Sequence, residues 1–130
     1  MYDKDLVRDI LMQIDNSASV IEERFSVVNS VDDLMDTPRG RERLDALCMQ
    51  LIAIGESLKS IDKITDRELL QHYPDVDWKG AKGIRDIISH HYFDLDAEEI
   101  YYVCDTQLPG LHQAIHKMIE ELYGGFSPEC

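Results

Sequence analysis

Hydrophobic residues recur every three or four positions over most of the chain, which is the spacing of one face of an α-helix. A first pattern covers residues 7–28, and the polar, turn-forming stretch NSVDDLMDTPRG then interrupts it. Pro38 suits the first turn of the next helix, whose apolar positions run over 44–61. Gly55 lies inside that pattern at a cost of about 1 kcal/mol relative to alanine, so we expect another helix to pass close to it.

Three further segments have a helical pattern. TDRELLQHYP predicts a short helix, and DVDWKGAKGIRDIISHHYF predicts a long one that ends in a loop at 93–94. Asp96 then caps AEEIYYVCDTQLPGLHQAIHKMIEELY, which Pro109 should kink or divide. Long amphipathic helices with short connections predict an all-α fold, an antiparallel up-and-down bundle of four to five helices. We expect a single domain over residues 1–123 and a frayed tail over 124–130.

The composition fits one such domain, with 130 residues of which 44% are hydrophobic. The first ten residues are charged where a signal peptide would be apolar, and no apolar stretch approaches the roughly 20 residues that span a bilayer. We therefore expect a cytoplasmic protein that is not attached to a membrane. The three cysteines, Cys48, Cys104 and Cys130, lack C-x-x-C spacing, and we expect two of them to be core residues rather than metal ligands.

The charge restricts which partners are possible, because 26 acidic residues against 13 Lys and Arg give a formal net charge of −13. A protein that bound nucleic acid with its whole surface would be basic. Any anionic substrate must therefore meet a local positive patch, which a partner chain could supply or reinforce.

The segment RDIISHHYFD, residues 85–94, holds the candidate chemistry. An ideal helix places four residues of this region on one apolar face: Ile84, Ile87, Ile88 and His91. It places four others on a polar face: Lys82, Arg85, Ser89 and Tyr92. His90 lies apart from both, about 140° from Arg85. We expect His91 to pack with the isoleucines against the core or a partner subunit. We expect His90 to be free for chemistry, and it meets Arg85 only if the helix loosens or a second subunit contributes.

The polar face is locally basic, since Lys79, Lys82 and Arg85 recur every three residues with no acid before Asp86. A guanidinium that holds phosphate beside an imidazole that titrates near neutrality is a minimal set for cleaving a phosphodiester. The alternative is an arginine and a histidine that are solvated or that cap the helix end.

The stretch RDIISHHY fits the R-x-x-x-x-H-x-Y pattern of the HEPN superfamily and resembles HepT-like toxins in particular. The pattern assigns Arg85, His90 and Tyr92, and Asp86 stands at the polar position after the arginine. IGESLKSI, YPDVDWKGAKGIRD and LPGLHQAI resemble other characteristic stretches of the family, so the likeness covers about residues 43–122.

This resemblance implies a HEPN-like bundle that forms a homodimer, with arginine and histidine of both protomers in one cleft. The implied function is the toxin of a type VII toxin–antitoxin system, a metal-independent ribonuclease without a cofactor that cuts mRNA or tRNA. The implied partner is an MntA-like nucleotidyltransferase antitoxin that transfers AMP to Tyr92. Arg85 and His90 are then the catalytic residues, with supporting phosphate contacts from Lys79, Lys82 and Asp86.

Two alternatives stay open at this point. Tyr92 could simply pack and form a hydrogen bond at the helix end. The whole chain could be a non-catalytic helical partner that regulates a nucleotidyltransferase. The presence of Arg85, His90 and Tyr92 together argues against the second alternative, because a pure scaffold has no need of all three.

Overall fold

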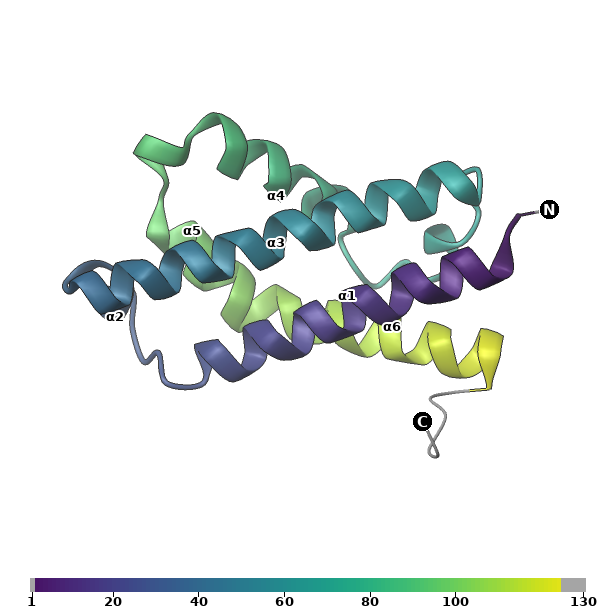
Figure 1. Ribbon diagram of the computed structural model, residues 1–130, viewed down its shortest axis with the longest axis horizontal. Helices are drawn as coiled ribbons and strands as arrows, with labels where there is room; N and C mark the ends of the chain where they lie inside the picture. The colour runs from purple at the N-terminus through teal and green to yellow at the C-terminus, as the bar shows by residue number, and fades with distance from the viewer. Residues whose placement is uncertain (1, 125–130) are drawn as a thin grey trace.

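A computed structural model describes residues 2–124, with the side chain of Tyr92 excepted. These residues form helices and turns and no strand, which confirms the predicted all-α class (Figure 1). The α-helices are α1 (Lys4–Phe25), α2 (Asp32–Met35), α3 (Pro38–Ile64), α4 (Trp78–His90), α5 (Ala97–Tyr102) and α6 (Leu108–Tyr123). The shorter elements are the 3-10 turns η1 (Leu70–His72) and η2 (Tyr92–Asp94) and the π-helical segment η3 (Val103–Gln107).

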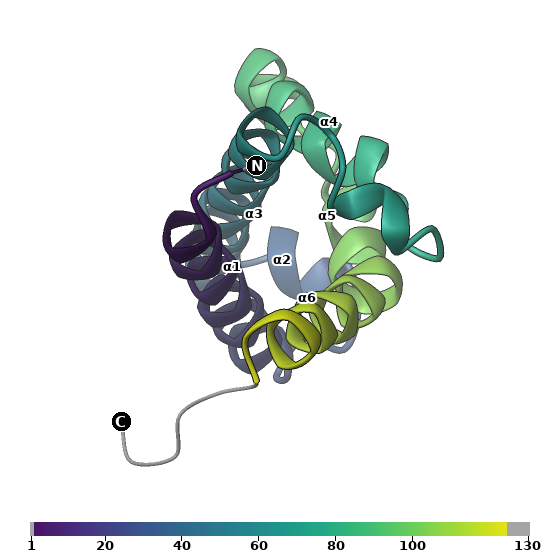
Figure 2. The same ribbon diagram turned by 90° about the vertical axis from the view of Figure 1, so that its right-hand side faces the viewer.

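The long helices run up and down beside one another, as the sequence predicts (Figure 1). Helix α3 packs against α1 on one side and α4 on the other, and α6 packs against α1. Seen along the bundle, α1, α3, α4 and the α5–α6 segment surround a common interior (Figure 2). The predicted limit of the domain at residue 123 stays a prediction, and residues 125–130 of the expected tail, Cys130 included, lie outside the described part.

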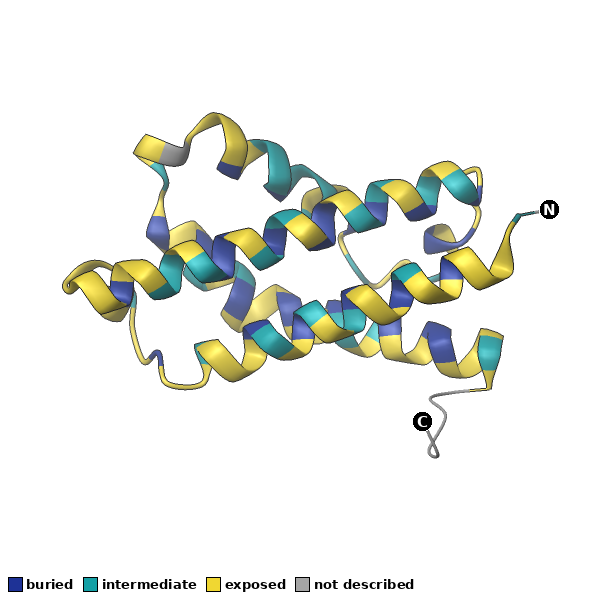
Figure 3. Cartoon of the chain, in the orientation of Figure 1, coloured by how far each residue is buried: buried dark blue, intermediate teal, exposed yellow. Residues whose placement is uncertain are grey.

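The interior is filled by the apolar positions that recur every three or four residues, while the outer faces are exposed (Figure 3). Burying one such aliphatic side chain contributes about 1.5–3 kcal/mol, so this stripe dominates the stability of the bundle. Cys48 and Cys104 belong to the core, as expected, and burial raises the pKa of their thiols to about 11 and about 12. The largest fully buried side chains include Leu11, Ile14, Ile21, Leu47, Leu58, Ile61, Ile88, Ile100, Ile115 and Met118.

Local signals set several helix ends. Pro38 opens α3, and the Thr37 hydroxyl accepts a hydrogen bond from the Gly40 amide at 2.9 Å. Asp96 caps α5 in the same way, with its carboxylate 2.9 Å from the Glu98 amide. Pro109 divides the predicted last helix, because it has no N–H, and α6 begins beside it after the π-helical segment.

Two sequence expectations about helices were wrong. The stretch TDRELLQHYP forms no α-helix beyond the end of α3: the Thr65 hydroxyl bonds the Ile61 carbonyl at 2.8 Å and closes α3. Asp66 and Arg67 then adopt left-handed backbone angles, with φ of 54° and 65°, and only the 3-10 turn η1 follows. The interrupting stretch after α1 contains the short helix α2, which buries Leu34.

The predicted close approach at Gly55 is confirmed. A Cβ built on Gly55 would lie 3.0 Å from the Cβ of Arg85 and 3.3 Å from the carbonyl oxygen of Ala81. Glycine therefore lets α4 lie against α3, and this contact sets the position of Arg85. No helix among the described residues is long and apolar enough to cross a membrane.

Candidate active site

Helix α4 carries the R-x-x-x-x-H-x-Y segment and is fastened to the bundle at its start. Asp77 caps it through a hydrogen bond of 2.9 Å to the Gly80 amide. The buried Trp78 donates its indole N–H to the Tyr73 carbonyl at 2.8 Å. Ile84 and Ile88 face the core with 5% and 2% exposure, so the opposite face of α4 points to solvent.

Arg85 is held in place by two carboxylates. Its Nη1 donates to Asp86 at 3.0 Å, and its Nε, shielded from solvent, meets Glu56 of α3 as an ion pair rather than as a well-aligned hydrogen bond. The hydrogen bond to Asp86 and the charge of Glu56 raise the pKa of the guanidinium. The side chain is still 37% exposed, so a charged and positioned guanidinium is available at the surface.

The neighbouring lysines are also paired with acids. Lys82 forms an ion pair with Asp62 of α3, and Lys59 of α3 lies 3.5 Å from Asp86. The hydrogen bond from Arg85 and the charge of Lys59 lower the pKa of Asp86, which keeps this carboxylate ionised. Lys79, also on α4, is exposed at the start of the helix.

Sequence reasoning missed Glu56 and Asp62, because it read the polar face of α4 by itself. A signal was present, since Gly55 predicts that α3 touches another helix and Glu56 is the next residue. The face that looks purely basic in the sequence is a network of alternating charges between α3 and α4.

The two histidines lie at the end of α4 and both are exposed. The helix stops at His90, and His91 leaves the helical angles with φ −124° and ψ 28° while its amide still bonds the Ile87 carbonyl. The expectation that His91 packs against the core is therefore wrong for the single chain, because the helix ends before it can turn His91 onto the isoleucine face. Packing against a partner subunit stays a prediction.

The motif residues are near one another in sequence, but the structure does not bring all of them into contact. Among the described residues, no hydrogen bond or ion pair joins Arg85 to His90. Tyr92 opens the turn η2 directly after the histidines, and its side chain lies outside the described part. One chain thus offers a fixed guanidinium and an exposed imidazole at separate points of the same helix end.

Among the described residues, no three His, Cys, Asp or Glu side chains are arranged to hold a metal ion. An exposed guanidinium can bind an anion and an exposed imidazole can transfer a proton, so Arg85 and His90 make these two kinds of chemistry available.

The whole chain was compared with protein families, curated proteins and solved structures. A family model described as "Ribonuclease HepT-like" matches residues 14–118, which includes α4. Curated relatives come from Methanocaldococcus jannaschii. "Putative RNase MJ0127" is 24% identical over 81% of this chain and 85% of its own, and "Putative RNase MJ1216" is 23% identical over 77% and 87%. "Putative RNase MJ0125" is 28% identical over 58% of this chain and 60% of its own. No solved structure gives a significant match.

Proposed function

The chain belongs to the HepT-like ribonuclease family, and we propose that it is the toxin of a type VII toxin–antitoxin system that cleaves RNA at a cleft shared by two protomers. Its enzyme class is ribonuclease. The observation that carries the proposal is the position of Arg85 and His90 at the exposed end of α4, with Arg85 fixed against α3. We also propose that the protein acts in the cytoplasm, because mRNA and tRNA are found there.

The proposed reaction uses the RNA itself as the source of the nucleophile. The 2′-hydroxyl attacks the adjacent phosphorus while His90 accepts its proton, and the P–O5′ bond breaks as the protonated His90 gives that proton to the leaving oxygen. Arg85 stabilises the negative charge on the phosphoryl oxygens in the transition state. The products are a 2′,3′-cyclic phosphate and a 5′-hydroxyl end, and DNA is inert because it has no 2′-hydroxyl.

Arg85 keeps donors for a phosphate despite its two carboxylate partners. A guanidinium has five N–H groups on three nitrogens, and the described contacts engage only Nε and Nη1. The carboxylates of Glu56 and Asp86 hold the guanidinium of Arg85 in one orientation, so its remaining N–H donors are already oriented before the RNA binds. Binding then costs less conformational entropy, because the Arg85 side chain is already ordered.

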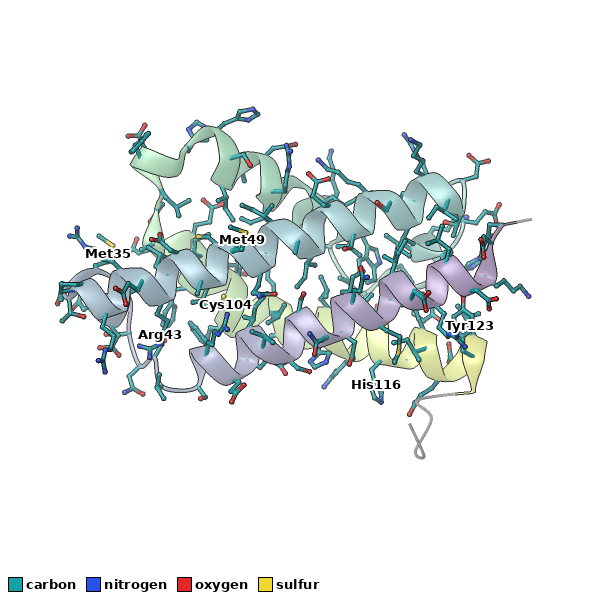
Figure 4. The ribbon with its side chains drawn as sticks, in the orientation of Figure 1. Met35, Arg43, Met49, Cys104, His116 and Tyr123 are labelled. Carbon is teal, nitrogen blue, oxygen red and sulfur yellow. The ribbon has the colours of Figure 1, made fainter. Side chains whose placement is uncertain are left out.

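A second protomer is proposed because one chain does not bring Arg85 and His90 into contact. Large apolar side chains are exposed on α3, on α4 and in the segment that follows it: Met49 at 64%, Ile87 at 37%, Phe93 at 96% and Tyr102 at 53%. Figure 4 shows Met35 and Met49 along the upper edge of the α2–α3 segment, the side on which α4 lies in this view. A two-fold axis at this surface would cover apolar area and bring two copies of the motif into one cleft.

The proposed control is transfer of AMP to Tyr92 by an MntA-like nucleotidyltransferase antitoxin. Support comes from the place of Tyr92 in the motif and from its position in a turn whose neighbours His91 and Phe93 are exposed. A phosphate attached there adds negative charge beside the motif and competes with the substrate's phosphate for Arg85.

Expression of the toxin alone, with sequencing of cellular RNA ends, tests the proposal. The wild type should arrest growth and produce cyclic-phosphate ends, and Arg85→Ala or His90→Ala should abolish both. His91→Ala is the matched control, because His91 is the exposed neighbour of His90 and should keep most activity. Loss of cleavage in His91→Ala with an active His90→Ala would refute the assignment. Unchanged RNA ends with the wild type would favour a non-catalytic regulator of the nucleotidyltransferase.

A further inference from the structure

A groove between the second half of α3 and the first half of α4 concentrates positive charge. Five cationic side chains line it: Lys59, Lys63, Arg67, Lys79 and Lys82. Three acids line it as well: Asp62, Asp66 and Asp86. The lining therefore carries a formal charge of 5 − 3 = +2 on a chain whose net charge is −13. Five of the 13 Lys and Arg residues gather in this one place.

The acids neutralise only part of this positive charge. Lys82 is paired with Asp62, and Lys59 is paired with Asp86. In the part of the chain that the structure describes, Lys63, Arg67 and Lys79 have no carboxylate within ion-pair distance, and all three are exposed. Three charged groups thus remain for an anionic ligand.

The turn after α3 brings Arg67 to the groove by an uncommon backbone conformation. Asp66 and Arg67 both have positive φ, which residues other than glycine rarely adopt. The Arg67 amide donates to the Asp62 carbonyl at 2.8 Å, so the chain folds back onto the end of α3 and does not lead away from it. Left-handed residues and a bond of this kind close the C-terminal ends of many helices, and here they fix where Arg67 lies relative to α3.

The groove is continuous with the candidate active site. Asp86, which lines it, also accepts the hydrogen bond from Arg85. Lys59, which also lines the groove, is paired with the same carboxylate. A strand whose scissile phosphate lies at Arg85 can therefore continue along the groove without leaving the surface.

We propose that this groove binds the sugar–phosphate backbone of the RNA strand on one side of the cleavage position, with Lys63, Arg67 and Lys79 contacting phosphates. The inference rests on the proposed ribonuclease function and adds residues of α3 and of the following turn to the substrate site. Contacts of this type position a strand without reading its bases, so the groove raises affinity for RNA of any sequence. It also supplies the local positive patch that an acidic chain needs.

The test measures binding of a single-stranded RNA oligonucleotide whose 2′-hydroxyls are all methylated, so that it cannot be cleaved. The triple variant Lys63→Gln, Arg67→Gln, Lys79→Gln should bind on the order of tenfold or more weakly at moderate salt. If three phosphate contacts are lost, the slope of log K against log salt should fall by about 2, at roughly 0.7 per contact. Cleavage of a natural RNA should show a raised KM and a kcat close to that of the wild type.

A second triple variant, Lys4→Gln, Arg24→Gln, Lys117→Gln, is the matched control. These three residues are exposed and lie outside the groove, and the variant changes the net charge by the same amount. It should bind RNA like the wild type.

The possible outcomes separate the two proposals. If the wild type cleaves RNA and both triple variants bind alike, the groove proposal is wrong and the ribonuclease proposal stands. If the wild type neither binds nor cleaves RNA, the proposed function itself fails. If the groove variant binds RNA normally but escapes the antitoxin, the groove is a docking surface for an acidic protein and the RNA proposal is overturned.

Discussion

Replacing Gly55 by alanine tests how tightly α4 is seated on α3. The added Cβ would lie 3.0 Å from the Cβ of Arg85, 3.3 Å from the Ala81 carbonyl oxygen and 3.4 Å from the Lys82 carbonyl oxygen. These neighbours are backbone atoms and the root of a side chain, so α4 must move away by a few tenths of an ångström. The substitution therefore changes the position of Arg85, the proposed catalytic arginine, without changing its chemistry.

Two effects of opposite sign set the magnitude. Alanine is favoured over glycine by about 1 kcal/mol inside a helix. Overpacking a close contact costs about 1–3 kcal/mol. We expect Gly55→Ala to lower the free energy of unfolding by about 0–2 kcal/mol.

Gly83 of α4 offers the matched control. A Cβ there would meet nothing within 4 Å, so Gly83→Ala should gain up to about 1 kcal/mol from helix propensity alone. The two variants make the same chemical change in packed and open surroundings. Their free energies of unfolding should differ by about 1–3 kcal/mol.

Thermal unfolding followed by circular dichroism measures this difference. For a chain of this length, 1 kcal/mol shifts Tm by about 3–5 °C, so Gly55→Ala should melt below Gly83→Ala by about 3–15 °C. RNA cleavage should fall about two- to tenfold in Gly55→Ala, because Arg85 is displaced. Equal stabilisation of both variants would refute the reasoning, since it would mean that α4 does not press on α3 at Gly55.

Three further predictions concern the proposed chemistry, assembly and control. Cleavage should persist in excess EDTA, and a strict requirement for a divalent ion would refute the metal-independent mechanism. Ile87→Glu should shift a dimer to monomer in analytical ultracentrifugation and reduce cleavage more than tenfold, since it places a charge in the proposed interface; an active monomer would contradict the shared cleft. Co-expression with an active nucleotidyltransferase should add the mass of one or more AMP groups to the wild type but not to Tyr92→Phe; full neutralisation at unchanged mass would mean that the partner works by occlusion.

The sequence determined the features that depend on neighbours along the chain. The period of apolar residues predicts the long helices, because each helix must bury one stripe whatever it packs against. Pro38 and Asp96 mark helix starts, and Pro109 predicts the division between α5 and α6. These signals are visible in the sequence because each one makes or removes a backbone hydrogen bond within a single helical turn. The amino-acid sequence also shows the motif at the end of α4, and Gly55 indicates that another helix lies close to α3.

Other features arise only when distant segments meet. Arg85 and Glu56 are 29 residues apart in sequence, and although Gly55 indicates that α3 meets another helix, it does not indicate that Glu56 meets Arg85. The exposure of His91 depends on where α4 stops, and that point is decided by the turn η2 and the path back to α5 rather than by the helical pattern.

The basic groove belongs to the second group as well. In the sequence, Arg67 falls in a segment that predicts a short helix, whereas the chain instead reverses at Asp66 and Arg67. This reversal brings Arg67 to the groove that Lys63 of α3 and Lys79 of α4 also line. Local propensity can specify a helix and its caps, because those interactions span a single turn. Which charges share a surface is decided by how two helices cross, and that depends on the packing of the whole bundle.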